Sequence, residues 1–153
     1  MVFVIKLFDK QVIKMNISML CVGKLREPYL REAAEEYIKR ISRFTSFQVY
    51  EFEDAEKLIE KIENFDYRIL LDIEGEQMSS KEFADFIREN SLKWKKICFI
   101  VGGWKGFEPE INEIVDKRIS LSKMTFPYQL CRIILLEQIY RAFTIIKGID
   151  YNK

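Results

Sequence analysis

Histidine is absent from all 153 residues of the chain. This absence excludes Ser-His and Cys-His nucleophile systems, and it removes the commonest general base at neutral pH. Any proton transfer that the protein carries out must therefore use carboxylates, tyrosines or water.

Cysteine is scarce, with three residues far apart in the chain: Cys21, Cys98 and Cys131. Their spacing matches no known metal motif, and each lies among apolar residues. We interpret them as buried, reduced thiols. With so few soft ligands and no imidazole, a zinc site is excluded, and we expect the protein to use no metal.

Long apolar runs are also missing. No segment reaches the roughly 20 residues that a membrane-spanning helix needs, and charged residues interrupt the N-terminal 14 residues before a signal-type core could form. Hydrophobic residues make up 48% and charged residues 32%, the balance of an ordinary globular protein. We expect a single cytoplasmic domain over residues 1–153 that does not bind membranes. Residues 1–15 are interpreted as an N-terminal extension, with Met15 or Met19 as alternative natural starts.

Charge is unevenly distributed although the net value is only +1. Residues 51–66 carry seven acids and two lysines, whereas residues 117–153 carry seven basic residues and two acids. This polarity is compatible with a basic face that binds a polyanion. Charged residues on solvated helix faces produce similar counts about half the time.

Strand and helix patterns alternate along the chain. Apolar runs or alternation predict strands at residues 16–24, 47–53, 67–73, 97–101 and 118–122. Helices are predicted at residues 29–41, around 58–62, after a capping box formed by Ser79 and Glu82, after Pro109, and from Pro127 to near Gly148. This order predicts an α/β fold with a mostly parallel sheet. Since the last helix is apolar nearly all round, we expect a second subunit to cover it in a homodimer.

Three of the six glycines, Gly102, Gly103 and Gly106, directly follow the strand predicted at residues 97–101. A glycine pair after a strand more often reflects a tight turn, and neither a P-loop nor a dinucleotide fingerprint is present. Ligands of parallel sheets bind beyond the carboxyl ends of strands. We therefore expect loops 71–76, 102–106 and 120–125 to share one rim, where glycine backbone could read a flat base and Leu71, Leu121 and Met124 could pack on its faces.

Three segments of the chain match a known family: "LLDIEGEQMSSKEFADFI", "FIVGGWKGF" and "ISLSKMTFPYQLCRIILLEQIYRAFTIIKGIDYNK". From about Asn16 to the C-terminus the chain closely resembles the RlmH family of SPOUT-class methyltransferases. These enzymes methylate a pseudouridine of 23S ribosomal RNA with S-adenosylmethionine. The resemblance implies a SPOUT-type homodimer with a trefoil knot in its C-terminal half.

The resemblance also implies a set of cofactor contacts. They are Leu71, Gly102, Gly103, Gly106, Leu121, Ser122, Lys123, Met124, Thr125 and Phe126. Three positions depart from the family pattern: Trp104 replaces a proline after the glycine pair, and Tyr128 and Asn152 stand where histidines are common.

The candidates for proton removal are Glu137 and Tyr151. Each has a purely structural alternative, because Glu137 can pair with Arg141 one helical turn away and Tyr151 can belong to a loose tail. The basic residues expected to hold RNA are Lys105, Arg132, Arg141 and Lys153, with Lys123, Lys24 and Arg26 as further candidates. Trp104, Tyr128 and Tyr151 could stack on an unpaired base.

The leading hypothesis is therefore a methyltransferase that modifies ribosomal RNA, acting on assembled ribosomes because the small net charge argues against tight binding of naked RNA. One alternative keeps S-adenosylmethionine but places the methyl group at another RNA position. The other alternative is a non-catalytic RNA- or ribosome-binding dimer of the same fold.

Overall fold

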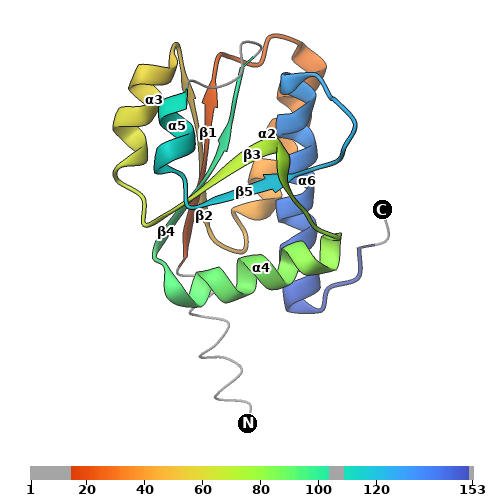
Figure 1. Ribbon diagram of the computed structural model, residues 1–153. Coiled ribbons are helices and arrows are strands. Elements are labelled where there is room, and N and C mark those ends of the chain that lie inside the picture. Colours follow the sequence, from red (N-terminus) through yellow and green to blue (C-terminus); the bar gives the residue numbers. More distant parts are fainter. Residues whose placement is uncertain (1–14, 104–108, 152–153) are drawn as a thin grey trace.

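The computed structural model describes residues 15–103 and 109–151, which form alternating strands and helices (Figure 1). Trp104, Lys105, Gly106, Asn152 and Lys153 lie outside the described residues. In chain order the elements are β1 (Asn16–Val22), α2 (Pro28–Ile41), β2 (Ser46–Phe52), α3 (Ala55–Ile62), β3 (Tyr67–Gln77), α4 (Ser80–Lys93), β4 (Lys96–Val101), α5 (Pro109–Ile114), β5 (Lys117–Ser120) and α6 (Tyr128–Lys147).

The strands form one parallel sheet in the order β2-β1-β4-β3-β5. The α/β fold expected from the sequence is thereby confirmed. Because all strands run in the same direction, the carboxyl ends of β3, β4 and β5 lie at one edge of the sheet. Of the three segments that were expected to share a rim, 102–103 and 121–125 follow β4 and β5 at this edge, whereas residues 71–76 are not a loop but belong to β3 itself.

Helices cover both faces of the sheet. α2, α4 and α6 pack on one face with Met19, Ile69 and Phe99, whereas α3 and α5 pack on the other with Leu20 and Leu70. Successive residues of a strand point to opposite faces, so strands buried on both sides must be apolar at nearly every position. This explains the uninterrupted apolar runs in β1 and β4.

Local signals set the helix ends. The side chain of Ser79 accepts a hydrogen bond from the backbone N–H of Glu82, and the Glu82 carboxylate accepts one from the N–H of Ser79. The predicted capping box is therefore confirmed. Pro127 precedes α6, and Gly148 ends it with φ +68°, a left-handed conformation that favours glycine.

The chief difference from the predicted elements is the length of β3. It continues to Gln77, four residues beyond the predicted end, because its second half pairs with β5. Leu71 and Glu76 both pair with Ile119, so the intervening residues bulge around that strand. A Cβ atom on Gly75 would lie 2.7 Å from backbone atoms of β5, and only glycine fits there. The trefoil knot that the resemblance implies stays a prediction.

Met15 is a second difference. It was assigned to the N-terminal extension, yet only 2% of its surface is exposed and it packs in the core beneath α2, α4 and α6. Its carbonyl also accepts a hydrogen bond from the Thr45 hydroxyl. Among the residues that the structure describes, no helix has the length and apolar character needed to cross a bilayer.

Candidate functional site

A pocket of about 430 Å³ lies at the carboxyl edge of the sheet. It is lined by the middle of β3, by the end of β4 and the two glycines after it, by the segment after β5, and by the first turn of α6. Its lining residues are Leu70, Leu71, Asp72, Ile73, Val101, Gly102, Gly103, Asn112, Leu121, Ser122, Met124, Thr125, Phe126, Tyr128 and Cys131. The structure thus brings together parts of the three segments singled out in the sequence, although the first of them, 71–76, is strand rather than loop.

The glycine wall of the pocket rests on β1. A Cβ atom on Gly103 would lie 3.4 Å from the carbonyl oxygen of Val22 and 3.6 Å from its Cγ1. The side-chain position of Gly103 therefore faces the neighbouring strand, and its backbone contributes to the pocket wall. From the sequence, we attributed the glycine at position 103 to a ligand that lies against the backbone. The structure adds a second reason, since Val22 approaches this position closely.

The opposite wall is the segment between β5 and α6, which is held by short-range hydrogen bonds. The Ser120 hydroxyl donates to the carbonyl of Ser122 at 2.9 Å, and the Ser122 hydroxyl accepts from the N–H of Met124 at 3.0 Å. The Cys131 thiol lies 3.7 Å from the carbonyl oxygen of Phe126, as a weak donor. These bonds shape the segment around the pocket.

Most of the expected cofactor contacts line this pocket. They are Leu71, Gly102, Gly103, Leu121, Ser122, Met124, Thr125 and Phe126. Lys123 is exposed and does not line the pocket, and Gly106 lies outside the described residues.

Sequence reasoning did not name six of the lining residues individually as site residues: Leu70, Asp72, Ile73, Val101, Asn112 and Cys131. Asp72 and Ile73 lie in segment 71–76, which was expected at the rim, so their position was an available signal. Asn112 is in α5, and no sequence pattern pointed to that helix as part of the pocket.

The pocket suits a ligand that combines a flat ring with polar groups. Its volume falls in the range of about 300–1,000 Å³ that is usual for small-molecule sites. Leucine, methionine and phenylalanine side chains supply apolar walls, while the Gly102–Gly103 backbone, Asp72 and Asn112 supply polar groups. The residues present therefore fit an adenosine-bearing cofactor.

The two candidates for proton removal contact each other. The Tyr151 hydroxyl donates to a carboxylate oxygen of Glu137 at 3.0 Å, and Arg141 donates to the same oxygen at 2.5 Å. The ring of Tyr151 packs edge-on against Tyr140 at 4.9 Å between centroids and lies beneath the Arg141 guanidinium. The predicted Glu137–Arg141 pair is confirmed, and Tyr151 is part of an ordered cluster rather than a loose tail.

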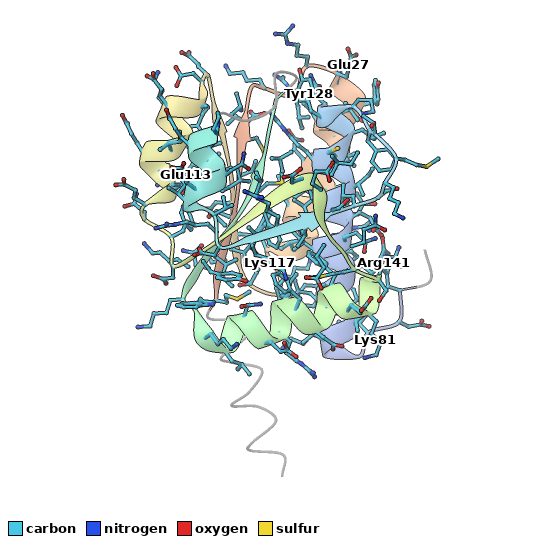
Figure 2. All side chains as sticks on the ribbon, viewed as in Figure 1. Glu27, Lys81, Glu113, Lys117, Tyr128 and Arg141 are labelled. Carbon is cyan, nitrogen blue, oxygen red and sulfur yellow. The ribbon has the colours of Figure 1, made fainter. Side chains whose placement is uncertain are left out.

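Burial and the hydrogen bond to Glu137 raise the pKa of Tyr151 well above its ordinary value. Tyr151 therefore stays protonated at neutral pH and acts as a hydrogen-bond donor. Within one chain neither Glu137 nor Tyr151 lines the pocket. Figure 2 shows this separation, with Tyr128 near one end of α6 and Arg141 toward the other.

Arg132 corrects one prediction. It was expected to contact RNA, but only 1% of its surface is exposed and its guanidinium donates to Glu51 and to two backbone carbonyls. It cannot neutralise a phosphate at the surface, so this prediction is wrong. Lys24 and Arg26 are exposed on the β1–α2 connection, while Lys105 and Lys153 lie outside the described residues.

The thiols are poor nucleophiles in this fold. Burial raises the pKa of Cys21 and of Cys98 to about 12, and it also raises the pKa of Cys131. Cys131 differs from the sequence interpretation, because it is only partly buried and lies at the pocket. Across residues 15–103 and 109–151, no group of three or more cysteine, aspartate or glutamate side chains is arranged to hold a metal ion.

Comparison with known proteins gives strong matches over nearly the whole chain. A family model described as "Predicted SPOUT methyltransferase" matches residues 15–152. A relative from Caldicellulosiruptor saccharolyticus, named "Ribosomal RNA large subunit methyltransferase H", is 42% identical and aligns over 90% of this chain and 99% of its own. A relative of the same name from Ruminiclostridium cellulolyticum is 41% identical over 91% of this chain and all of its own.

Solved structures support the fold. A "Probable Methyltransferase" from Bordetella pertussis superposes with a TM-score of 0.58 at 9% identity, covering 90% of this chain and 98% of that one. A methylase family protein from Haemophilus influenzae gives 0.57 at 12% identity, covering 90% of this chain and 71% of that one. The resemblance read from the sequence motifs is confirmed, and the chain belongs to the SPOUT methyltransferase family.

Proposed function

We propose that the protein transfers a methyl group from S-adenosylmethionine to a pseudouridine of large-subunit ribosomal RNA, in the cytoplasm and on assembled ribosomal particles. The observation that carries the proposal is the pocket of about 430 Å³ at which the middle of β3 and the end of β4 meet segment 121–126, in a chain of this family. The substrate is inferred from the names of relatives about 40% identical to this chain.

The pocket is the proposed cofactor site. S-adenosylmethionine supplies an activated methyl group on a sulfonium, so the protein's main task is to orient the reacting partners. Leu71, Leu121 and Met124 would pack on its adenine, and the Gly102–Gly103 backbone would hydrogen-bond to its polar edge. Gly106, Ser122, Thr125 and Phe126 complete the proposed set, and Lys123 is left out because it does not line the pocket.

Asp72 adds a carboxylate to the pocket wall. Its side chain is 26% exposed and its Oδ1 accepts the N–H of Glu74 at 3.1 Å, while its ion-pair partner among the described residues, Arg118, is 4.0 Å away at the limit of an ion pair. A carboxylate this weakly compensated favours a positively charged ligand, and the proposed cofactor carries a sulfonium and an ammonium group.

A dimer would bring the Glu137–Tyr151 pair to a pocket. Tyr128 and Glu137 are nine residues apart on α6, about 13 Å at 1.5 Å per residue, too far to act at one point within a chain. Exposed apolar side chains on or beside this helix include Met124, Leu130, Ile145 and Ile149, which a second subunit would cover. We propose a homodimer in which α6 packs against its counterpart and each pair serves the partner's pocket.

In that arrangement Glu137 would accept the proton lost by the base, and the protonated Tyr151 would hold the carboxylate in place. Lys105, Lys153 and the exposed edge of Arg141 would neutralise phosphates around the pocket mouth. Tyr128, at the pocket edge, would stack on the target base.

The test is methyl transfer from labelled S-adenosylmethionine to ribosomal particles isolated from cells that lack the gene. Mass spectrometry should locate one new methyl group on a pseudouridine of the large-subunit RNA. A methyl group at another nucleotide would establish the alternative RNA position. Absence of both transfer and cofactor binding at millimolar concentration would establish a non-catalytic binding protein.

A further inference from the structure

Arg132 is the largest side chain among those less than 2% exposed, and it carries a charge into the protein interior. A buried charge is tolerated only when several partners compensate for it. Arg132 has three: Nη1 donates to Oε2 of Glu51 at 2.8 Å, and Nη2 donates to the carbonyl oxygens of Val22 at 2.8 Å and Gly23 at 2.7 Å. Its Nε has no partner among the described residues.

The same network organises the loop that follows β1. Oε2 of Glu51 also accepts the N–H of Leu25 at 2.8 Å, so one carboxylate oxygen joins α6, β2 and this loop. The N–H of Gly23 donates to the carbonyl of Phe52 at 2.7 Å. The end of β1 is therefore fixed from two sides.

This network touches the proposed cofactor pocket at two walls. The Val22 carbonyl that Arg132 holds is the group against which Gly103 packs, 3.4 Å from the side-chain position of that glycine. On α6, Arg132 lies next to Cys131 and one turn after Tyr128, and both of these residues line the pocket. One guanidinium thus connects the glycine wall to the helix wall.

We infer that Arg132 is a positioning residue that sets the spacing between the Gly103 wall and the α6 wall of the cofactor pocket. This inference rests on the proposed function of that pocket. A lysine at position 132 would keep the charge but could not reach three acceptors with the planar geometry of a guanidinium. The walls would then shift relative to each other, and the pocket would bind its ligand less tightly.

The experiment measures the dissociation constant and the KM for S-adenosylmethionine in Arg132→Lys and Glu51→Gln, well below their melting temperatures. Arg88→Lys is the matched control, because Arg88 is 46% exposed and pairs with Asp85 only at 3.6 Å. We expect about a tenfold rise in both constants for Arg132→Lys, at least threefold for Glu51→Gln, and no change for Arg88→Lys. The maximal rate at saturating cofactor should fall less than threefold.

A merely structural role gives a different result. Loss of folded protein lowers the maximal rate but leaves KM unchanged, and that outcome in both variants would overturn the inference. If Arg132→Lys does not fold, Glu51→Gln alone decides, since the Glu51 side chain is 34% exposed. Gly103→Val tests the pocket independently. If Gly103→Val leaves cofactor affinity unchanged, the proposed site is wrong. If Gly103→Val weakens cofactor binding but Arg132→Lys does not, only the positioning role is refuted.

Discussion

Gly75→Ala is the sharpest test of how β3 and β5 build the site. A Cβ atom at this position would lie 2.7 Å from three backbone atoms of Arg118 and Ile119. Ordinary contacts begin at 3.4 Å, so the strands must separate by about 0.7 Å. Because the obstacle is backbone, no side-chain rotation can relieve it.

The expected cost follows from this overlap. Overpacking in a folded core typically destabilises by about 1–3 kcal/mol, and a clash with backbone should reach the upper end. For a chain of this size, 3 kcal/mol corresponds to a fall in Tm of about 6–12 °C. β5 leads directly into segment 121–126, so we also expect about a tenfold loss of affinity for S-adenosylmethionine.

Urea unfolding and calorimetric titration measure the two effects. Gly148→Ala is the matched control, because a Cβ there has no neighbour within 4 Å. This variant should lose only about 1–2 kcal/mol of folding stability, the amount that a non-glycine residue loses in the left-handed conformation. Its cofactor affinity should equal that of the wild type. The reasoning fails if Gly75→Ala unfolds within 1 kcal/mol of the wild type, or if it is no more destabilising than the control.

Three further predictions concern the site. Gly103→Ala should bind S-adenosylmethionine normally, since its Cβ makes only ordinary contacts with Val22. Gly103→Val has a branched side chain, and in calorimetric titration it should bind the cofactor about tenfold or more weakly. Asp72→Asn should weaken binding two- to fivefold at low salt and less at high salt, as expected for a partly exposed charge; equal losses at both salt concentrations would contradict an electrostatic role. The Tyr151–Glu137 bond needs a protonated phenol, so the stability that it supplies is present below pH 10 and is lost as the pH rises further. Denaturant titrations from pH 9 to 12 should therefore show a shallower alkaline loss of stability in Tyr151→Phe than in the wild type, and parallel curves would argue against the raised pKa.

Local patterns were sufficient to predict the elements of this fold. The apolar runs 19–22 and 97–101 indicated strands buried on both faces, and β1 and β4 have that environment. Ser79 with Glu82, and Pro127 with Gly148, marked helix ends because capping depends on residues adjacent in sequence. The shared rim then followed from the geometry of a parallel sheet.

The errors arose where distant segments determine the outcome. β3 extends to Gln77 because β5 supplies a pairing partner. Glycine is required at position 75 because the backbone of β5 passes close to it, and no local sequence pattern predicts that contact. Arg132 is different, because a signal was available. It lies three, four and seven residues before Leu135, Leu136 and Ile139, on the stripe of α6 that faces the core. A charged residue on a buried stripe indicates an internal partner rather than a surface ligand.

The absence of histidine affects the two parts of the proposed site unequally. The pocket is built from backbone, apolar side chains and short polar groups, and at its edge Tyr128 supplies a hydroxyl that accepts a hydrogen bond from Gln129 at 3.1 Å. Nothing in that construction needs an imidazole, although Tyr128 itself stands where the family commonly has histidine. For proton removal the proposed groups are Glu137 and Tyr151, which α6 and the residues after it bring within hydrogen-bond distance. The lack of both histidines therefore bears chiefly on the acceptor and its proton, and this is the part of the proposal that mass spectrometry of the RNA has to test.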